Sequence, residues 1–264
     1  MPAAAPARSD RLGQAVALML TYVALIVYVN ACGKVMGERF HPFEVTLFRH
    51  GTAFLFVTLA FLPRHGPRVF VPKRPWLQIP RGLCGICSSL CYFAGLTAMS
   101  LADAAAISFT TPLIVAALSG PVLREPVGIA RWAAIGVGFA GTLLIVRPGG
   151  GGIADWAGLL LFGSAVCSAG YQLLTRMVAG HDRAETTNIW SGLVGSCVML
   201  CLLPIYWTAP GRWEDWALFL SMGAVGGFAH YLLTWAGASA IVAAGLAVAR
   251  TERARRAGNG GRGA

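Results

Sequence analysis

Arg49 has the clearest chemical potential in the chain, because it lies inside a largely apolar run over residues 43–62. About seven residues into a helix, it would lie roughly 10 Å below a membrane surface. An arginine at that depth is costly and is usually paired or exposed to a wet cavity. Arg49 could therefore bind an anionic group of a ligand, with His50 beside it. The alternative is a structural ion pair with Glu44, near the mouth of the same helix.

The run "DAAAISFTTPLIVAAL", residues 103–118, carries polar residues and a proline at its centre. Pro112 cannot donate a backbone hydrogen bond and leaves a carbonyl one turn earlier free. Such breaks are tolerated where a helix lines a cavity or packs against protein. One interpretation is a bent, cavity-lining helix that offers the hydroxyls of Thr110 and Thr111 to a substrate. The other is a packing kink with both threonines bonded to their own backbone. Asp103 is expected to cap the helix, and a substrate role is the alternative.

Other polar or amphipathic side chains lie within apolar runs, where aromatic walls with a few polar groups suit flat organic ligands. Hydrogen bonding between helices is the alternative role for each of them. These candidates are Asn30, Tyr92, Tyr171, Gln172, His230, Tyr231 and Trp235. With Arg49, Thr110, Thr111 and Pro112 they make up the predicted substrate site.

Enzyme, metal and nucleotide chemistry are not expected. The seven cysteines all fall in apolar runs, which is typical of small packing residues. Cys84 and Cys87 have metal-site spacing, but no further ligands lie nearby. The glycines at 149–152 lack the Lys-Ser/Thr of a phosphate loop. We find no Ser–His–Asp set and no carboxylate pair in the sequence, so we predict a protein without a cofactor and without catalytic residues.

The elements that must position these residues are membrane helices. The chain is 56% hydrophobic and 12% charged, whereas soluble proteins carry roughly 25% charged residues. Eight apolar runs approach the roughly 20 residues needed to cross a bilayer. They cover residues 14–36, 43–62, 82–100, 104–123, 129–147, 156–178, 187–207 and 216–238. A ninth run, Ile241 to Ala249, would reach only about 14 Å as a helix. We therefore predict an all-α polytopic membrane protein.

Lysine and arginine are distributed unequally between the two sides of the predicted membrane. Sixteen fall on the side of the N-terminus, four fall on the other side, and Arg49 lies within a span. Positive residues favour the cytoplasm, so both termini are predicted to be cytoplasmic in a bacterial inner membrane. The net charge of +10 then reflects topology rather than nucleic-acid binding. The proline-rich segment 63–81 is predicted to be an extended cytoplasmic connection along the lipid surface.

The two halves of the chain resemble each other. Residues 92–100 align with 231–239 at an offset of 139, and Lys34 aligns with Arg176 at an offset of 142. Five spans in the first half would turn the second half upside down, and inverted repeats are typical of transporters. Ile241 to Gly245 matches Val137 to Gly141 at an offset of only 104. About 35 residues are therefore missing from the second half, including the counterpart of 103–118.

The segment "MSLADAAAISFTTPLIVAALSGPVLREPVGIARWAAIGVGFAGTLLIVRPG", residues 99–148, closely resembles the first EamA repeat of the drug/metabolite transporter superfamily. Residues 14–148 resemble that repeat throughout, and 156–239 resemble the first three spans of the second. The resemblance implies two inverted five-helix repeats, ten helices in intact members, and a central cavity for small metabolites. It divides the chain into a cytoplasmic N-terminus (1–13), a first repeat (14–148), a glycine-rich joint (149–155), an incomplete second repeat (156–250) and a basic, disordered tail (251–264).

The expected function is secondary transport of small organic metabolites or drugs by alternating access. The alternative is a truncated, inactive remnant of such a transporter. The expected partners are the lipid bilayer and a small-molecule metabolite, with no nucleic acid. A homodimer is a further candidate assembly, because a second copy would cover the gap left by the missing span.

Overall fold

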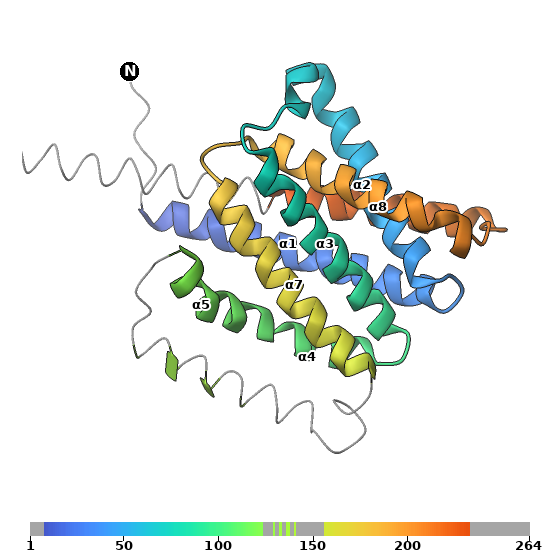
Figure 1. Cartoon of the computed structure of the whole chain (residues 1–264), viewed down its shortest axis with the longest axis horizontal. Coiled ribbons are helices and arrows are strands. Elements are labelled where there is room, and N and C mark those ends of the chain that lie inside the picture. The colour runs from blue at the N-terminus through green and yellow to red at the C-terminus, as the bar shows by residue number, and fades with distance from the viewer. Residues whose placement is uncertain are drawn as a thin grey trace, which may run out of the picture.

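The computed structural model describes residues 8–123 and 156–232, together with residues 129, 132–133, 136–137 and 140. The described residues form helices joined by short connections (Figure 1). The helices are α1 (Arg8–Gly37), α2 (Pro42–His65), η1 (Pro67–Phe70), α3 (Pro75–Leu96), α4 (Leu101–Ser108), α5 (Thr110–Leu123), α7 (Trp156–Val178) and α8 (Ala184–Tyr206). A further helix covers residues 213–232.

Six segments of these helices are long and apolar enough to cross a membrane. They are Leu20–Gly37, Pro42–His65, Pro75–Leu96, Leu101–Val122, Trp156–Val178 and Ala184–Tyr206. The prediction of an all-α polytopic membrane protein is therefore confirmed. Most of the predicted fifth span, the glycine-rich joint, the ninth apolar run and the basic tail lie outside the described residues.

The segment 63–81 differs from the extended connection that the sequence predicted. α2 continues to His65, η1 occupies Pro67–Phe70, and α3 already begins at Pro75. Pro67 and Pro75 each stand in the first turn of their helix, where the missing N–H of proline costs nothing. The prolines therefore start helices here, and α3 begins seven residues before the predicted span.

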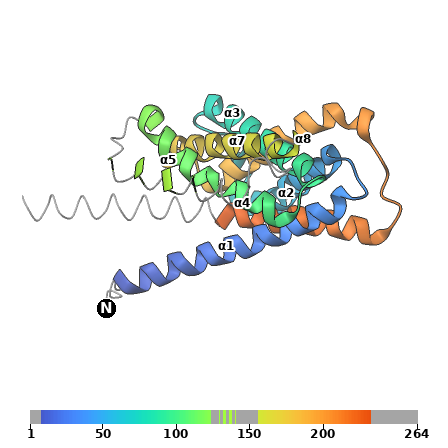
Figure 2. The same cartoon turned by 90° about the horizontal axis from the view of Figure 1, so that it is seen from below.

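The helices pack closely. α3 lies along α7 and α2 along α8 (Figure 1), while α1 covers one face of the bundle (Figure 2). Glycines permit the close contacts between membrane helices. A Cβ atom added at Gly192 of α8 would lie 2.7 Å from Phe54 Cβ of α2, and one at Gly95 of α3 would lie 2.7 Å from Leu161 Cγ of α7. Small residues therefore determine which helices meet.

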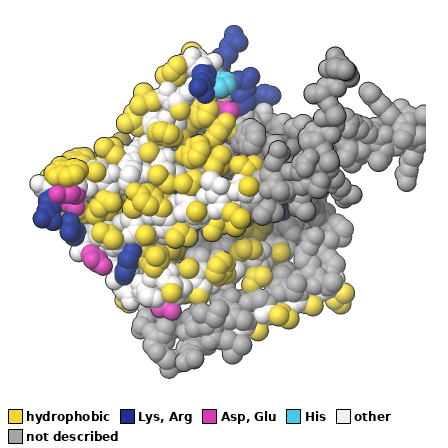
Figure 3. All heavy atoms as spheres, turned by 180° about the vertical axis from the view of Figure 1, so that it is seen from behind, with side chains coloured by type: hydrophobic (Ala, Val, Ile, Leu, Met, Phe, Trp, Pro, Cys, Tyr) yellow, Lys and Arg dark blue, Asp and Glu magenta, His cyan; other side chains and the backbone are white. Residues whose placement is uncertain are grey.

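Polar contacts join the helix ends in two separate groups. At one end Arg39 forms a 2.9 Å ion pair with Asp215, and Lys34 donates to the carbonyl oxygen of Leu96 at 2.7 Å. At the other end the Lys73 backbone N–H donates to Asp182 at 2.6 Å. On the face that Figure 3 shows, charged side chains gather at two edges and hydrophobic side chains cover the surface between them. This pattern fits a slab of hydrocarbon crossed by the helices.

Candidate substrate cavity

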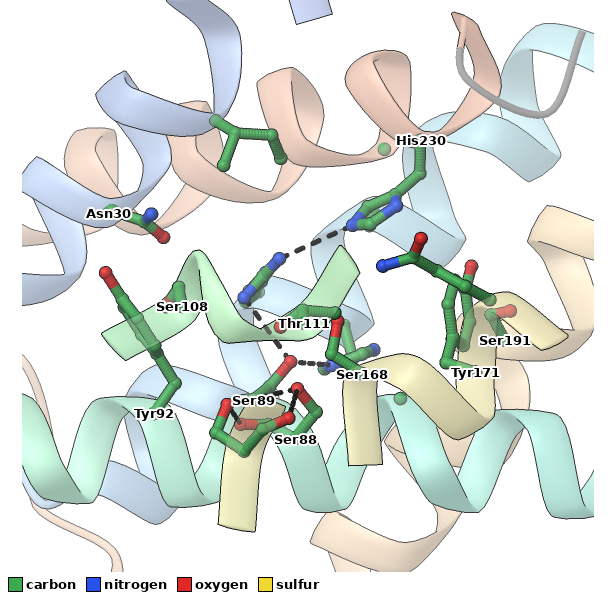
Figure 4. A pocket seen from close by; sticks show the side chains of 18 of the residues that line it. Asn30, Ser88, Ser89, Tyr92, Ser108, Thr111, Ser168, Tyr171, Ser191 and His230 are labelled. Carbon is green, nitrogen blue, oxygen red and sulfur yellow. Dashed lines mark hydrogen bonds between the residues drawn. The ribbon is translucent and has the colours of Figure 1, made fainter. Parts of the chain in front are cut away.

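A cavity of about 320 Å³ lies among the helices. Helices from both halves of the chain line it. Its wall contains Tyr22, Ile26, Asn30, Arg49, His50, Ala53, Val57, Gly85, Ser88, Ser89, Tyr92, Ser108, Thr111, Pro112, Ser164, Ala165, Ser168, Tyr171, Gln172, Asn188, Ser191, Gly192, Gly227 and His230. Asn30 and Tyr92 lie toward one end of the view in Figure 4, and Tyr171 and His230 toward the other.

Arg49 reaches the cavity from α2. Its guanidinium donates to Ser89 Oγ at 3.3 Å, lies 3.4 Å from His230 Nε2, and stands 5.5 Å from the centre of the Phe93 ring. His50 joins this group, because its Nε2 lies 3.1 Å from the same Ser89 hydroxyl. The cavity thus presents a cation among neutral polar groups.

Glu44, the alternative partner of Arg49, is engaged elsewhere. Its carboxylate accepts a hydrogen bond from the His41 backbone N–H at 3.3 Å, which forms part of a capping box at the start of α2. It also accepts a bond from the backbone N–H of Thr208. Among the described residues Glu44 makes no ion pair with Arg49. The interpretation of Arg49 as the partner of Glu44 is therefore wrong.

The polar break in the fourth span is a real interruption. α4 ends at Ser108 and α5 begins at Thr110, with Phe109 between them. Thr110 donates to the carbonyl oxygen of Ile107 at 2.6 Å, so it bonds its own backbone. Thr111 and Pro112 line the cavity. Thr110 therefore follows the interpretation of a packing kink, whereas Thr111 lies in the cavity wall and its contact with a substrate stays a prediction.

Asp103 stands in the first turn of α4, and the cap of that helix is Ser100. The Ser100 hydroxyl accepts from the Asp103 backbone N–H at 3.1 Å and donates to the Asp103 carboxylate at 2.6 Å. The prediction of Asp103 as the cap was therefore one turn out of place. The reason is local, since Ser100 stands three residues earlier and serine is also a preferred N-cap residue.

Most of the predicted site residues meet in this cavity. Those that line it are Asn30, Arg49, Tyr92, Thr111, Pro112, Tyr171, Gln172 and His230. Thr110 and Tyr231 do not line it, and the Tyr231 ring packs 4.7 Å from the Phe61 ring. Trp235 lies outside the described residues. What these residues bind stays a prediction.

Serines form a part of the wall that sequence reasoning missed. Six of them line the cavity: Ser88, Ser89, Ser108, Ser164, Ser168 and Ser191. Ser88 and Ser164 also join α3 to α7, because each hydroxyl donates to the other's backbone carbonyl, at 3.0 Å and 2.8 Å. A signal existed in α7, where Ser164, Ser168 and Tyr171 recur at the spacing of one helix face.

Arg81 was predicted to lie in the cytoplasmic connection and is instead fully buried in α3, with 0% of its surface exposed. Its guanidinium donates to the Thr187 carbonyl oxygen at 3.0 Å and 3.1 Å, to Thr175 Oγ1 at 3.1 Å, and to Ser191 Oγ. It also stands 4.6 Å from the centre of the Tyr171 ring and donates to the Tyr171 hydroxyl at 3.3 Å. Arg81 therefore bonds two residues of the cavity wall, Tyr171 and Ser191, without lining the cavity itself.

The part of the chain that the structure describes contains no group of three or more His, Cys, Asp or Glu residues that could hold a metal ion. The chemistry of this cavity lies in hydrogen bonds, aromatic faces and one cation. The profile of the EamA-like transporter family matches residues 13–147. This chain belongs to the EamA-like transporter family.

Several curated EamA-like relatives are named for the small molecules that they move. A riboflavin transporter of Rhizobium johnstonii is 32% identical over 205 residues, which cover 78% of this chain and 67% of that protein. An S-adenosylmethionine uptake transporter of Rickettsia prowazekii is 27% identical, covering 77% and 68%. A pseudopaline exporter of Pseudomonas aeruginosa is 25% identical, covering 78% and 72%. Family and relatives together support a multi-pass membrane transporter of small molecules.

The fold of this chain is also similar to that of a solved crystal structure. That structure covers 85% of this chain, and this chain covers 78% of it, with a TM-score of 0.61 and 21% sequence identity. At this identity the likeness concerns the fold alone.

Proposed function

We propose that this chain is a secondary transporter that moves small organic metabolites or drugs across a bacterial inner membrane by alternating access. The observation that carries the proposal is the polar cavity lined by membrane helices of both halves of the chain. Polar groups are expensive inside a membrane, and they persist there where they serve a pathway or bind a substrate. Lining by two halves is the arrangement in which rocking of one half exposes the cavity alternately to each side.

The polar contacts at the two ends of the bundle support this mechanism as candidate gates. Asp182, between α7 and α8, accepts from the Lys73 backbone N–H and from Gln78 Nε2 at 2.8 Å. At the opposite end Arg39 pairs with Asp215. Gln78 and Asp215 are buried, but Lys73 and Arg39 are exposed, and polar contacts with an exposed partner are weak and reversible. An opening at either end would therefore break a few such contacts and leave the packed helices intact.

The packing of α2 on α8 supports an inverted repeat. With the sequence offset of 142, residue 50 corresponds to residue 192, and residue 53 corresponds to residue 195. The structure shows a close contact of His50 with Gly195. Its symmetry equivalent would join residue 53 to Gly192. The contact observed there is that of Phe54 with Gly192, which is one position away. Two helices related by an in-plane two-fold axis must cross at equivalent positions.

A second pair of helices agrees with the same axis. The helix over 213–232 corresponds to α3, and α1 corresponds to α7, so the contact of α3 with α7 should recur between the helix over 213–232 and α1. The Tyr28 hydroxyl of α1 lies 2.8 Å from Ser221 Oγ, and Gly226 contacts Val29. We therefore propose two inverted repeats, the second incomplete, in line with the domain division predicted from the sequence.

Topology reporters are expected to place both termini in the cytoplasm. The expectation rests on the excess of lysine and arginine on one side. Reporter fusions after Gly180 and after Ala249 should give a cytoplasmic signal, and a fusion after Gly211 should give a periplasmic one. A periplasmic signal after Ala249 would contradict the eight-span arrangement.

Filling the cavity is expected to stop transport. In a panel of labelled compounds that includes riboflavin, chosen because of the Rhizobium relative, Ser89→Trp should reduce uptake into proteoliposomes at least about tenfold, since an indole removes the space that a ligand needs. Leu159→Trp is the matched control, because Leu159 lies in α7 with 70% of its surface exposed. Equal uptake by wild type and Ser89→Trp would rule the cavity out as the transport site.

The alternative function is that of an inactive remnant. It is favoured by the roughly 35 residues missing between Ser239 and Ile241 relative to the first half. Failure of the wild-type chain to move any compound of the panel, with Leu159→Trp equally inactive, would support the remnant over the transporter.

A further inference from the structure

We infer that the cargo is an organic anion whose negative group pairs with Arg49, and that the chain exchanges one such anion for another. This inference rests on the proposed transport function and names the class of substrate for the same cavity. It starts from the surroundings of one guanidinium group.

The partners of Arg49 are neutral and distant. A guanidinium has five N–H donors in a planar fork, whereas the structure gives Arg49 the Ser89 hydroxyl at 3.3 Å and the His230 ring at 3.4 Å. Both distances lie at the long end of the range for hydrogen bonds. No carboxylate of the described residues lies within ion-pair distance of Arg49. Its remaining donors are available to a ligand in the cavity, and a carboxylate is the group that matches this fork in a bidentate way.

The sequence also offers no acidic residue at the depth of Arg49. The chain has 11 aspartates and glutamates. Ten lie outside the predicted spans: Asp10, Glu38, Asp103, Glu125, Asp155, Asp182, Glu185, Glu214, Asp215 and Glu252. The exception is Glu44, whose carboxylate is bound to the backbone N–H groups of His41 and Thr208. An opposite charge compensates a buried charge, and we infer that for Arg49 the ligand supplies it, because the long contacts of its guanidinium leave donors that the neutral partners do not use.

The rest of the wall narrows the class of anion. Tyr22, Tyr92 and Tyr171 give the cavity aromatic faces, and the six serines give it hydroxyls. Flat rings suit such aromatic walls, and the hydroxyls suit polar substituents on the ring. A planar ring with a carboxylate group is therefore the best match to the lining.

Pairing with Arg49 has a consequence for the transport cycle. When an anion is bound, the site that closes around it contains a neutral pair. When the cavity is empty, closing it removes water from an uncompensated cation, which is much more costly. Reorientation of the loaded chain should therefore be faster than reorientation of the empty chain, and this difference favours exchange over net movement.

Binding of matched acids and amides tests the charge pairing. We would measure the affinity of the purified, full-length protein for three pairs: benzoate and benzamide, nicotinate and nicotinamide, and indole-3-carboxylate and indole-3-carboxamide. At least one acid should bind about tenfold more tightly than its amide, as one charge-assisted contact would give. Arg49→Gln should reduce that preference to within about twofold. Arg49→Lys keeps the charge without the fork and should give an intermediate preference.

The control variant for charge is Arg68→Gln, which removes an exposed arginine of η1 outside the cavity and the candidate gates. Its preference for acids should equal that of wild type, and unfolding curves without ligand should show that each Arg49 variant is folded. If no acid of the panel is preferred over its amide, or if Arg49→Gln keeps the preference, the inference is overturned. If Arg49→Gln does not fold, Arg49→Lys supplies the test. A full wild-type preference for acids in Arg49→Lys would exclude recognition by the guanidinium fork.

Counterflow tests the exchange. Proteoliposomes preloaded with the preferred acid should take up the labelled acid about tenfold faster than empty ones. Equal rates would overturn exchange. Transport of a neutral compound such as riboflavin that Ser89→Trp blocks, without any preference for acids, would overturn the anion and leave the proposed transporter standing. Acid binding that depends on Arg49 in a chain that transports nothing would overturn the proposed transporter and leave the anion site standing.

Discussion

Replacing Arg81 with methionine is expected to lower the free energy of unfolding by about 3–5 kcal/mol, because hydrogen bonds to a charged group contribute about 1.5–3 kcal/mol each and several are lost together. The guanidinium is fully buried and supplies hydrogen bonds to the Thr187 carbonyl oxygen and to the hydroxyls of Thr175, Ser191 and Tyr171. Methionine replaces only the aliphatic part of the arginine side chain and donates nothing, so these acceptors would lose their shared donor in the protein interior. Thermal unfolding in detergent, followed by tryptophan fluorescence, measures the loss.

Two further variants separate the fork from the charge. Arg81→Lys keeps the positive charge but cannot bond four groups in one plane, so it should recover less than half of the lost stability. Arg68→Met is the control, because Arg68 is exposed in η1, and surface substitutions there should change stability by less than about 0.5 kcal/mol. An unfolding midpoint of Arg81→Met equal to that of wild type would show that the cluster around Arg81 does not stabilise the fold.

Adding one methyl group at Gly192 is expected to separate α2 from α8 and to cost about 2–3 kcal/mol. A Cβ there would lie 2.7 Å from Phe54 Cβ and 2.9 Å from Phe54 Cα, and a backbone atom cannot rotate away as a long side chain can. The shape of the cavity should change as well, since Gly192 lines it. Gly192→Ala is therefore expected to lower both the unfolding midpoint and uptake into proteoliposomes.

The matched control is the same substitution at Gly163 of α7. A Cβ there meets nothing within 4 Å. Alanine is favoured over glycine in a helix interior by up to about 1 kcal/mol, so Gly163→Ala should be neutral or slightly stabilising. If both variants unfold at the same temperature, the contact of α2 with α8 is looser than the structure indicates.

Hydropathy predicted the membrane-crossing segments well and the helix ends less well. The predicted span 156–178 coincides with α7, where the apolar run and the helix have the same limits. α1, by contrast, begins at Arg8, and α3 begins at Pro75. Hydropathy reports the thickness of hydrocarbon, whereas a helix can continue beyond the membrane face as long as its backbone is bonded. The misplacement of Arg81 follows directly, because it was counted with the basic residues of a loop.

The sequence identified the large side chains of the cavity wall but not the small ones. Arg49 and Tyr92 stand out in apolar runs because their burial needs a reason. Serines do not stand out, since a serine can bond the carbonyl one turn earlier and pack almost anywhere in a membrane helix. Thr110 and Thr111 are neighbours in sequence, and only the local geometry of the helix break directs one toward its own backbone and the other toward the cavity.

The residues of the cavity wall should differ in how readily they change over evolutionary time. Tyr171 and Ser191 contact the cavity and also belong to the buried cluster around Arg81. A mutation at either position alters ligand contacts and stability together, so selection would remove most of them. Asn30 of α1 and Thr111 of α5 also line the cavity, and neither is among the described partners of Arg81. Lineages descended from this chain are therefore expected to acquire new substrates first through α1 and α5, with Tyr171 and Ser191 retained.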